Sequence, residues 1–496
     1  MTVPLQHPEQ AARWLHEHVR GGLCTDSRQV TPGDGFIAWP GAAHDGRHHV
    51  AGAVAGGAVA CLVEREGVEQ FDFGGYPVAD YAGLKAATGP IAAAYFDHPS
   101  KALQIAAVTG TNGKTTTAWW LAQALSRLGR RCGLVGTLGI GEPGAMVPNG
   151  LTTPDPVLLQ QQLRLFVQSG YAACAIEASS IGIEEHRLDS VAIEVAVFTN
   201  FTQDHLDYHA DMDAYWRAKR ALFDWPGLKS AVINLDDVKG AELVVSLAGG
   251  TLDVWSFSCR GPARLAARGI HHGPRGASFE LIEGHENRRV DTALVGHFNV
   301  ANLLGVLAAL RAMGVPLDDA LEGCKDLLPV PGRMEVISAE NEPLVIVDYA
   351  HTPDALDKVL AALKPIARSR GGQLWCVFGC GGDRDTSKRP LMARVAQQHA
   401  DHIVVTSDNP RGEDPLAIIE QIRQGLHAHH GVQVEADRAR AIAAALRVAS
   451  VRDVVLLAGK GHEPYQEIRG VRVPYSDHAQ AALGLAARKI GPEPRT

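Results

Sequence analysis

The 496-residue sequence lacks several patterns that would define its chemistry or its location. Its eight cysteines are scattered, and no two have the Cys-x-x-Cys spacing of a zinc or redox site. No apolar run approaches the roughly 20 residues needed to cross a bilayer, and the N-terminus has no basic stretch followed by an apolar block. No dense lysine or arginine stripe is present, and the formal net charge is −8. We therefore expect a cytoplasmic protein with buried free thiols, no nucleic-acid partner and no membrane insertion.

The composition and length indicate a globular, multidomain chain. With 46% hydrophobic and 21% charged residues, the sequence is too long for one hydrophobic core. Short strand-like pieces and glycine or aspartate turns fill residues 1–98. Residues 99–331 and 332–496 each repeat an apolar strand, a polar loop and an amphipathic helix, which predicts parallel sheets. The prolines of "LPVPGRME", near residues 329–331, suit a hinge between these two segments.

One stretch, "VTGTNGKTTT" at residues 108–117, predicts a phosphate-binding loop. It follows the apolar run "IAAVT" and precedes a helix-spaced pattern, although Val108 stands where the usual motif has its first glycine. Glycines let backbone amides turn inward, the helix start favours anions, and Lys114 adds a positive charge. Thr115 could ligate a magnesium ion that bridges the phosphates. An ordinary glycine turn with a solvated lysine is the alternative interpretation.

Polar residues follow other predicted strands and are expected at the same edge of the sheet. Glu177 and Ser179 end one apolar run, Asp204 and His205 follow the next, and Asn234 follows a third. Glu177 and His205 are candidate magnesium ligands, directly or through water, although each could also be a satisfied loop residue.

Eight ordered motifs over nearly the whole chain resemble the Mur ligases. They are TGTNGKTTT, EASS (177–180), TNFTQDHLDYH (199–209), GHFNVANLLGVLAA (296–309), PGRME (331–335), DYAHTPDAL (348–356), GCGGDRD (379–385) and GKGHE (459–463). The resemblance implies three α/β domains: a small mixed uridine-nucleotide domain (1–98), a central P-loop ATPase-like parallel-sheet domain (99–331) and a C-terminal Rossmann-like domain (332–496). It is strongest to the members that add the third residue of the peptide.

The resemblance also implies the reaction. A substrate carboxylate is phosphorylated by ATP with Mg²⁺, and an amine then attacks the acyl phosphate to form an amide. The implied substrates are UDP-N-acetylmuramoyl-L-alanyl-D-glutamate and meso-2,6-diaminopimelate, in peptidoglycan precursor synthesis, and the protein is expected to act as a monomer. Phosphorylation makes chemical sense because a carboxylate repels nucleophiles and its oxide is a poor leaving group.

The resemblance assigns the ATP and metal sites. Lys219, which by pattern alone is a solvated helix lysine, corresponds to a carbamylated lysine, and a carbamate would offer oxygens to magnesium. The expected catalytic residues are Lys114, Lys219, His205 and Glu177; the metal ligands are Thr115, Glu177, His205 and Lys219. The expected nucleotide contacts are Gly110, Thr111, Asn112, Gly113, Lys114, Thr115, Thr116, Asn299, Arg333 and Asp348.

The resemblance also places the first two domains against the muramoyl peptide. Ser27 and the turn of Ala42, Ala43 and His44 are expected near the uridine diphosphate, although from pattern alone this stretch is a turn-rich surface. Ile181 and Glu185 depart from the histidine and glutamine common in the family, which affects local substrate contacts. The peptide contacts expected in the central domain are Thr152, Thr153, Ser179, Glu185 and Arg187.

The third domain is expected to choose the amino acid. "DNPR" at 408–411 presents Arg411 after a rigid proline turn, and its guanidinium can fork onto the distal carboxylate that distinguishes meso-diaminopimelate from lysine. Lysine-adding relatives lack this arginine. The full set expected to hold the amino acid is Arg384, Asp408, Asn409, Pro410, Arg411, Gly459 and Glu463.

Other functions share parts of this pattern. A folylpolyglutamate synthase-like ligase has a similar loop and chemistry but needs no uridine-binding domain. A lysine-adding Mur ligase differs at the amino-acid site. A phosphate-loop switch or motor would hydrolyse nucleotide without an amino-acid acceptor, and a simple nucleotide-binding module would leave the third domain's polar loops unused.

Overall fold

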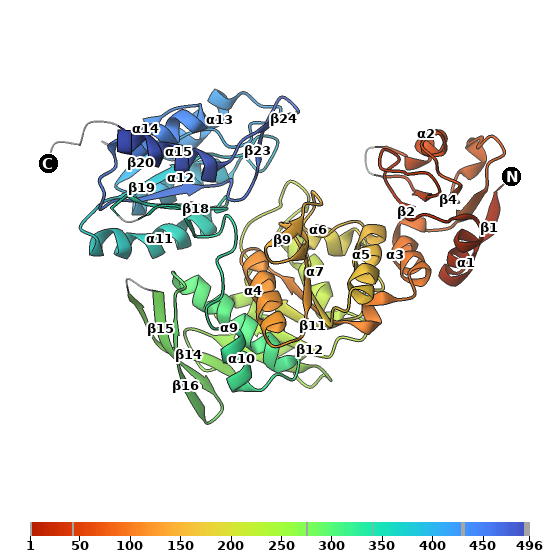
Figure 1. The fold of residues 1–496 in the computed structure, drawn as a ribbon, viewed down its shortest axis with the longest axis horizontal. Coiled ribbons are helices and arrows are strands. Elements are labelled where there is room, and N and C mark those ends of the chain that lie inside the picture. The colour runs from red at the N-terminus through yellow and green to blue at the C-terminus, as the bar shows by residue number, and fades with distance from the viewer. Residues whose placement is uncertain (1, 42–43, 274–275, 340, 428–431, 491–496) are drawn as a thin grey trace.

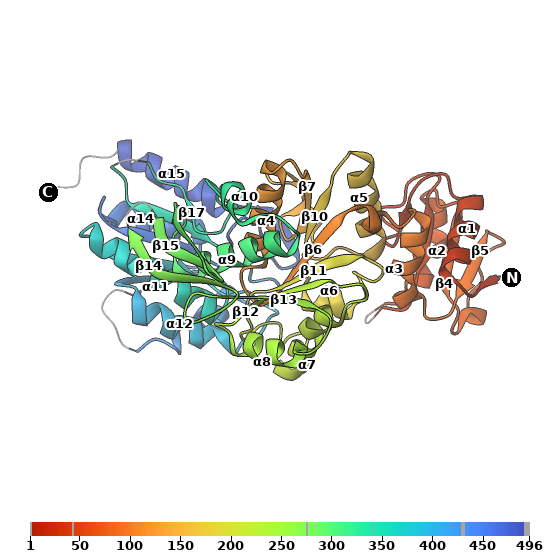
Figure 2. The same cartoon turned by 90° about the horizontal axis from the view of Figure 1, so that it is seen from below.

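The computed structural model describes residues 2–41, 44–273, 276–339, 341–427 and 432–490. Three large sheets follow one another along the chain, and a small two-stranded sheet follows the third. Figure 1 shows three bodies, with the first and third large sheets on different sides of the central one. The rotated view in Figure 2 shows an elongated arrangement with the first and third large sheets toward opposite ends.

The first sheet is parallel throughout, in the order β1-β5-β4-β3-β2. Helices α1 and α3 cover one face through Leu15 and Ile91, and α2 covers the other through Val50 and Ala53. The bounds are β1 (Val3–Leu5), α1 (Pro8–His18), β2 (Leu23–Cys24), β3 (Gly35–Ala38), α2 (Val50–Ala55), β4 (Ala60–Glu64), β5 (Val78–Tyr81) and α3 (Leu84–Tyr95).

The second sheet has 11 strands in the order β16-β15-β14-β13-β12-β11-β6-β10-β7-β8-β9. Its first half begins with the predicted strand, loop and helix. The bounds there are β6 (Gln104–Thr109), α4 (Lys114–Arg127), β7 (Cys132–Gly136), β8 (Gly139–Glu142), β9 (Ala145–Val147), α5 (Pro156–Gln168), β10 (Ala173–Glu177), α6 (Ser180–Glu184), β11 (Ile193–Phe198) and α7 (Met212–Arg220).

The second half of this sheet extends away from the first domain (Figure 1). Its elements are β12 (Ser230–Asn234), α8 (Val238–Leu247), β13 (Asp253–Ser258), β14 (Leu265–Gly273), β15 (Gly276–Glu283), β16 (Glu286–Thr292), α9 (His297–Ala312) and α10 (Leu317–Gly323). Helices α4, α9 and α10 cover one face of the sheet, and α5 and α8 cover the other.

The centre of this sheet is parallel, but both edges are not. Strands β7, β8 and β9 pair antiparallel, as do β14, β15 and β16. The turn around Gly144 between β8 and β9 is short, so the chain reverses there without the helix that a parallel crossover requires. A parallel sheet alone, as expected from sequence, therefore describes only the interior strands.

The third sheet has six strands in the order β17-β18-β22-β19-β20-β21, and only β17 is antiparallel. Helices α11, α12 and α13 pack on one face and α14 and α15 on the other. The bounds are β17 (Glu335–Val336), β18 (Leu344–Asp348), α11 (Pro353–Ser369), β19 (Leu374–Phe378), α12 (Lys388–His399), β20 (His402–Val405), α13 (Pro415–Arg423), β21 (Val432–Val434), α14 (Arg438–Val448), β22 (Val454–Ala458) and α15 (Asp477–Ile490). Between β22 and α15, β23 (Tyr465–Ile468) and β24 (Val471–Pro474) pair antiparallel in the separate two-stranded sheet.

The expected α/β class is confirmed, with helices on both faces of each sheet. The three large sheets span residues 3–81, 104–292 and 335–458, so the domain boundaries at 98 and 331 that we proposed from sequence fall between them. No helix among the described residues is both long and apolar enough to span a bilayer.

Candidate functional site

The phosphate loop lies between β6 and α4, as the sequence predicts. Gly110 has a φ of 145°, and a Cβ at this position would collide with the Thr199 hydroxyl. Gly113 has a φ of 86°, and a Cβ there would press on the Asn302 amide. The loop is therefore closed from two sides, and the first amides of α4 face the same space without intrahelical acceptors.

The end of β11 braces the loop. The Thr111 backbone amide donates to the Asn200 carbonyl at 2.9 Å, and the Asn112 amide donates to Asn200 Oδ1 at 2.9 Å. Thr199 Oγ1 donates to the Asn112 carbonyl at 2.6 Å. These bonds preform the loop, which lowers the entropy cost of gripping a phosphate chain.

Lys114 points back into the loop. Its Nζ donates to the carbonyls of Gly110 and Thr111, each at 2.9 Å, and burial lowers its pKa while nearby Glu177 opposes that shift. A cation held in this position offers its charge to a polyphosphate, as expected of a phosphate-loop lysine.

Lys219 does not lie on a solvated face. It is 1% exposed on α7, and its Nζ donates to the Gly110 carbonyl at 2.8 Å. Burial and the neighbouring Lys114 lower its pKa well below that of a free lysine. The interpretation from pattern alone was therefore wrong, and the amine is held next to the phosphate loop.

Glu177 is buried at the end of β10, with 1% of its surface exposed. Thr115 Oγ1 donates to its Oε2 at 2.9 Å, and Thr137 donates through its backbone amide at 2.8 Å and its hydroxyl at 3.1 Å. The side chain therefore directly contacts the start of the phosphate-loop helix.

His205 lies beside Asp204, with its Nε2 3.5 Å from Asp204 Oδ2, and His351 approaches the same carboxylate at 3.9 Å. Burial lowers the pKa of His205 to about 4, so its imidazole is neutral at physiological pH. Burial alone would raise the pKa of Asp204, but His205, His351 and Lys388 lower it well below its usual range. The positive charges of Lys114 and Lys219 also lower the pKa of His205.

The proposed metal ligands do not form a ready cation site. Among the described residues, no group of three or more histidine, cysteine, aspartate or glutamate side chains could hold a metal ion. The Thr115 hydroxyl instead donates a hydrogen bond to Glu177, and the unmodified Lys219 amine donates one to the Gly110 carbonyl. The oxygens of Thr115 and Glu177 and the neutral His205 would suit magnesium better if Lys219 carried a carboxylate.

The proposed peptide contacts adjoin Glu177. Thr153 Oγ1 donates to the Glu177 carbonyl at 2.7 Å and lies 3.0 Å from Ser179 Oγ. Arg187 donates to the Thr153 carbonyl at 3.0 Å, and Thr152 Oγ1 lies 3.0 Å from Thr137 Oγ1. These side chains form one polar wall next to the phosphate loop.

Glu185 contacts the first domain. It forms a 2.8 Å ion pair with Lys85 of α3, and the Tyr208 hydroxyl donates to its Oε1 at 2.7 Å. Glu185, which stands where the family commonly has a glutamine, thus has two protein partners in this chain. Near it, Ile181 is partly buried in the short helix α6.

The first domain's proposed contacts are only partly described. Ser27 is partly buried in the loop after β2. His44 is exposed, and its carbonyl accepts from the Gly41 amide at 2.8 Å. Ala42 and Ala43 lie outside the described residues.

Asn299, Asn302, Arg333 and Asp348 lie around the loop from other elements. Asn299 Nδ2 donates to the Val295 carbonyl at 2.8 Å, whereas Asn302 contacts Gly113 and donates to Asn299 Oδ1 at 3.3 Å. Arg333 stacks 4.4 Å from the centre of the Tyr349 ring and reaches Thr115 Oγ1 at 3.4 Å. Burial raises the pKa of Asp348, which accepts the Met334 amide at 2.8 Å.

In the third domain, most of the proposed amino-acid contacts cluster around a lysine that sequence reasoning missed. Lys460 is fully buried; its Nζ donates to Asn409 Oδ1 at 3.0 Å and to Glu463 Oε2 at 2.8 Å, and lies 3.8 Å from Asp408. Gly459 has a φ of 113°, and a Cβ there would collide with Asp408. Lys460 lies within GKGHE, so that motif was the signal that could have revealed it.

Arg411 has protein partners in this structure. Its Nη1 donates to the Gly382 carbonyl at 2.9 Å, its Nε lies 3.9 Å from Glu467 Oε2, and its side chain is 22% exposed. Its φ of 48° follows directly after Pro410. Part of the guanidinium therefore stays free for a ligand carboxylate.

Segment 203–209 joins the central domain to both others. Gln203 Nε2 contacts Asp385 and Ser387, and Asp207 forms a 2.9 Å ion pair with Arg384. One residue later, Tyr208 bonds Glu185, the partner of Lys85. Arg384 is thus brought to the centre, but its partner here is a protein carboxylate.

Family models match this chain in three consecutive stretches. "Mur ligase family, catalytic domain" covers residues 21–94, "Mur ligase middle domain" covers 108–310, and "Mur ligase, glutamate ligase domain" covers 332–461. The chain belongs to the Mur ligase family. These matches include the phosphate loop, the polar wall and the third-domain cluster described above.

Among its relatives, the UDP-N-acetylmuramoyl-L-alanyl-D-glutamate--2,6-diaminopimelate ligase of Acidovorax sp. (strain JS42) is 60% identical over 97% of both chains. The enzyme of the same name from Janthinobacterium sp. (strain Marseille) is 48% identical over 96% of both. A solved structure of a ligase with this name has a TM-score of 0.63 and 36% identity, and covers 94% of this chain and 95% of its own.

Proposed function

We propose that this Mur ligase adds meso-2,6-diaminopimelate to the D-glutamate carboxylate of UDP-N-acetylmuramoyl-L-alanyl-D-glutamate, with ATP, in peptidoglycan precursor synthesis. The observation that carries the proposal is the meeting of three groups at one sheet edge: the braced phosphate loop, the polar wall of Thr153, Ser179 and Arg187, and the third domain's Arg333. Relatives up to 60% identical bear the name of this activity.

The residues support a two-step reaction. In the first step, the D-glutamate carboxylate attacks the terminal phosphorus of ATP and ADP leaves, while Lys114, the first amides of α4 and Arg333 offset charge on the moving phosphoryl group. In the second, the amine of diaminopimelate attacks the acyl carbon, phosphate leaves and the amine loses a proton. We propose that bound Mg²⁺, held through Thr115, Glu177, His205 and a carbamylated Lys219, supplies further charge neutralisation on the phosphates.

We also propose that Arg384 and Arg411 hold the carboxylates of the amino acid, with Asp408, Asn409 and Glu463 facing its ammonium groups. Arginine forks match carboxylates, and acidic or amide oxygens accept from ammonium. The eight free cysteines suit a reducing compartment, so we place the enzyme in the cytoplasm, and we expect it to act as a monomer.

The decisive test measures ADP release with UDP-muramoyl-alanyl-glutamate, with and without meso-diaminopimelate. We expect turnover only when the acceptor is present, and a loss of about 100-fold or more in kcat for Lys114→Ala. Acceptor-independent ATP hydrolysis, or a Lys114→Ala variant that joins the substrates at the parental rate, would refute the proposal.

A further inference from the structure

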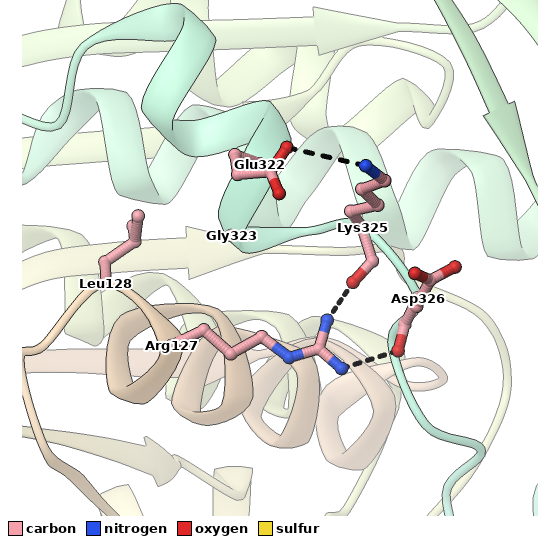
Figure 3. A pocket seen from close by; sticks show the side chains of 6 residues that line it. All are labelled: Arg127, Leu128, Glu322, Gly323, Lys325 and Asp326. Carbon is pink, nitrogen blue, oxygen red and sulfur yellow. Dashed lines mark hydrogen bonds and ion pairs between the residues drawn. The ribbon is translucent and has the colours of Figure 1, made fainter.

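The linker between the second and third domains lies along the phosphate-loop helix. Beginning at the end of α4, Arg127 donates to the backbone carbonyls of Lys325 and of Asp326, the second at 2.6 Å. Figure 3 shows this guanidinium turned toward the linker backbone. At the other end of α4, Arg333 reaches Thr115. The linker therefore runs antiparallel to the helix over about 18 Å, the rise of 12 helical residues.

Between these ends, Gln123 holds the linker by both atoms of its amide. Gln123 Oε1 accepts from the Leu328 backbone amide at 3.0 Å, and its Nε2 donates to the Leu328 carbonyl at 3.3 Å. Trp120 Nε1 donates to the same carbonyl at 3.2 Å. Gln123 is 8% exposed and Trp120 2%, whereas the Leu328 side chain is 62% exposed, so it is the Leu328 backbone that α4 binds.

The hydrogen bonds to Leu328 and the packing of Val330 determine the residue after which the linker is free to change conformation. Val330, 1% exposed, packs in the same core as α4, so the linker is anchored up to this residue. Beyond Pro331, Gly332 and Met334 both have positive φ values, of 67° and 48°. Arg333 lies between them, three residues beyond the last anchored position. If the linker shifted by one residue at Leu328, the Arg333 guanidinium would move about 3 Å away from Thr115.

We infer that Gln123 is a positioning residue for the ligase reaction: its two bonds to the Leu328 backbone set the register of the linker and so deliver Arg333 to the phosphate loop. The inference rests on the proposed function, because Arg333 matters there through the nucleotide. Gln123 contacts neither substrate nor nucleotide in this role and acts only through the linker.

A double-mutant cycle tests this coupling. Gln123→Met keeps the length and volume of the side chain but removes both bonds, and we expect kcat/KM for ATP to fall on the order of 10-fold. In an Arg333→Ala background, the same substitution should change kcat/KM less than about twofold, because there is no longer an arginine to position. Equal losses in both backgrounds would overturn the inference and assign Gln123 a general structural role.

Two further variants keep the test decisive. Ser126→Ala removes a bond from the same helix to the Cys132 amide, not to the linker, and should leave kcat/KM unchanged. If Gln123→Met does not fold, Trp120→Phe removes one of the two donors to the Leu328 carbonyl and should show a smaller loss that also disappears with Arg333→Ala. A parental enzyme that forms no product would instead refute the proposed function, whereas an active parent with an unaffected Gln123→Met variant overturns only this inference.

Discussion

At the scale of single residues, the most unusual group is the buried amine of Lys219. A neutral amine can attack carbon dioxide and, after losing a proton, become a carbamate, whereas an ammonium cannot. Burial and Lys114 lower the pKa of Lys219, which favours the neutral form. The structure thus gives a chemical reason for the carbamylation that the family resemblance implies.

We expect Lys219→Ala to lose most activity, since the variant can form no carbamate. High bicarbonate should not restore the activity, but short carboxylic acids that occupy the space left by the Lys219 side chain should. Lys229→Ala, which removes an exposed lysine paired with Glu194, serves as the control and should behave as the parent does. An unimpaired Lys219→Ala variant would rule out a role for the carbamate.

A second residue-scale prediction concerns pH. Burial, together with Arg333 and Lys460, lowers the pKa of His462 from 6.5 to about 4. Between these values the unfolded chain binds more protons than the folded one, so stability should fall as pH decreases from 6.5 to 4. We expect His462→Gln to show a smaller loss of Tm between pH 7 and 5 than the parent.

The control for this measurement is His285→Gln in the exposed turn between β15 and β16, which should leave the pH dependence of Tm unchanged. If the parent and His462→Gln lose the same Tm over this range, His462 is not the group that titrates.

At the scale of elements, strand, loop and helix around Lys114 could be predicted because local patterns determine them. The antiparallel edges could not, since the alternating pattern of residues 276–292 does not say which strand it will pair with. Among side chains, the pattern alone misplaced Lys219 on a solvated face, because its α7 pattern is that of a surface helix, whereas the family resemblance had assigned it to the site. Burial there depends on Gly110, more than 100 residues away in sequence.

The loop 408–411 gives an element-scale prediction about specificity. Arg411 keeps part of its guanidinium free, and a carboxylate without that partner loses a charged hydrogen bond. We expect Arg411→Ala to lower kcat/KM for meso-diaminopimelate on the order of 100-fold while changing the already low value for lysine less than about threefold. Comparable kcat/KM values for the two amino acids in the parent would contradict this reading of the loop.

At the scale of the whole molecule, the third domain docks beside the phosphate loop, where Asn112 and the linker at Gly332 contact it. Asn112 Nδ2 donates to Asp354 Oδ2 at 2.9 Å, and Gly332 packs against the backbone of Gly461 and His462. Sequence could place a hinge at the prolines before Gly332, but not these contacts, because each joins segments that lie more than 100 residues apart in the sequence.

Gly332→Ala should disturb this docking. The added Cβ would collide with the His462 backbone, so the third domain must shift away from the linker. We expect kcat to fall about 10-fold or more, the radius of gyration from small-angle scattering to increase, and Tm to change little because no sheet core is touched.

Gly314→Ala is the matched control, since Gly314 also has a positive φ, of 80°, but open space around its Cβ position. The Gly314→Ala variant has similar backbone strain but no collision with a neighbouring segment, so it should retain the parental kcat and radius of gyration. If both variants lose the same kcat, backbone strain alone explains the loss and the collision at His462 does not contribute.

Segment 203–209 has a thermodynamic consequence. An amino acid that draws Arg384 away from Asp207 alters the surroundings of Tyr208, which supports Glu185 and its bridge to the first domain. Such linkage is reciprocal, so each substrate should change the Kd of the other by the same factor. The amino acid and the distant uridine end of the other substrate would then be linked through a single short stretch of backbone.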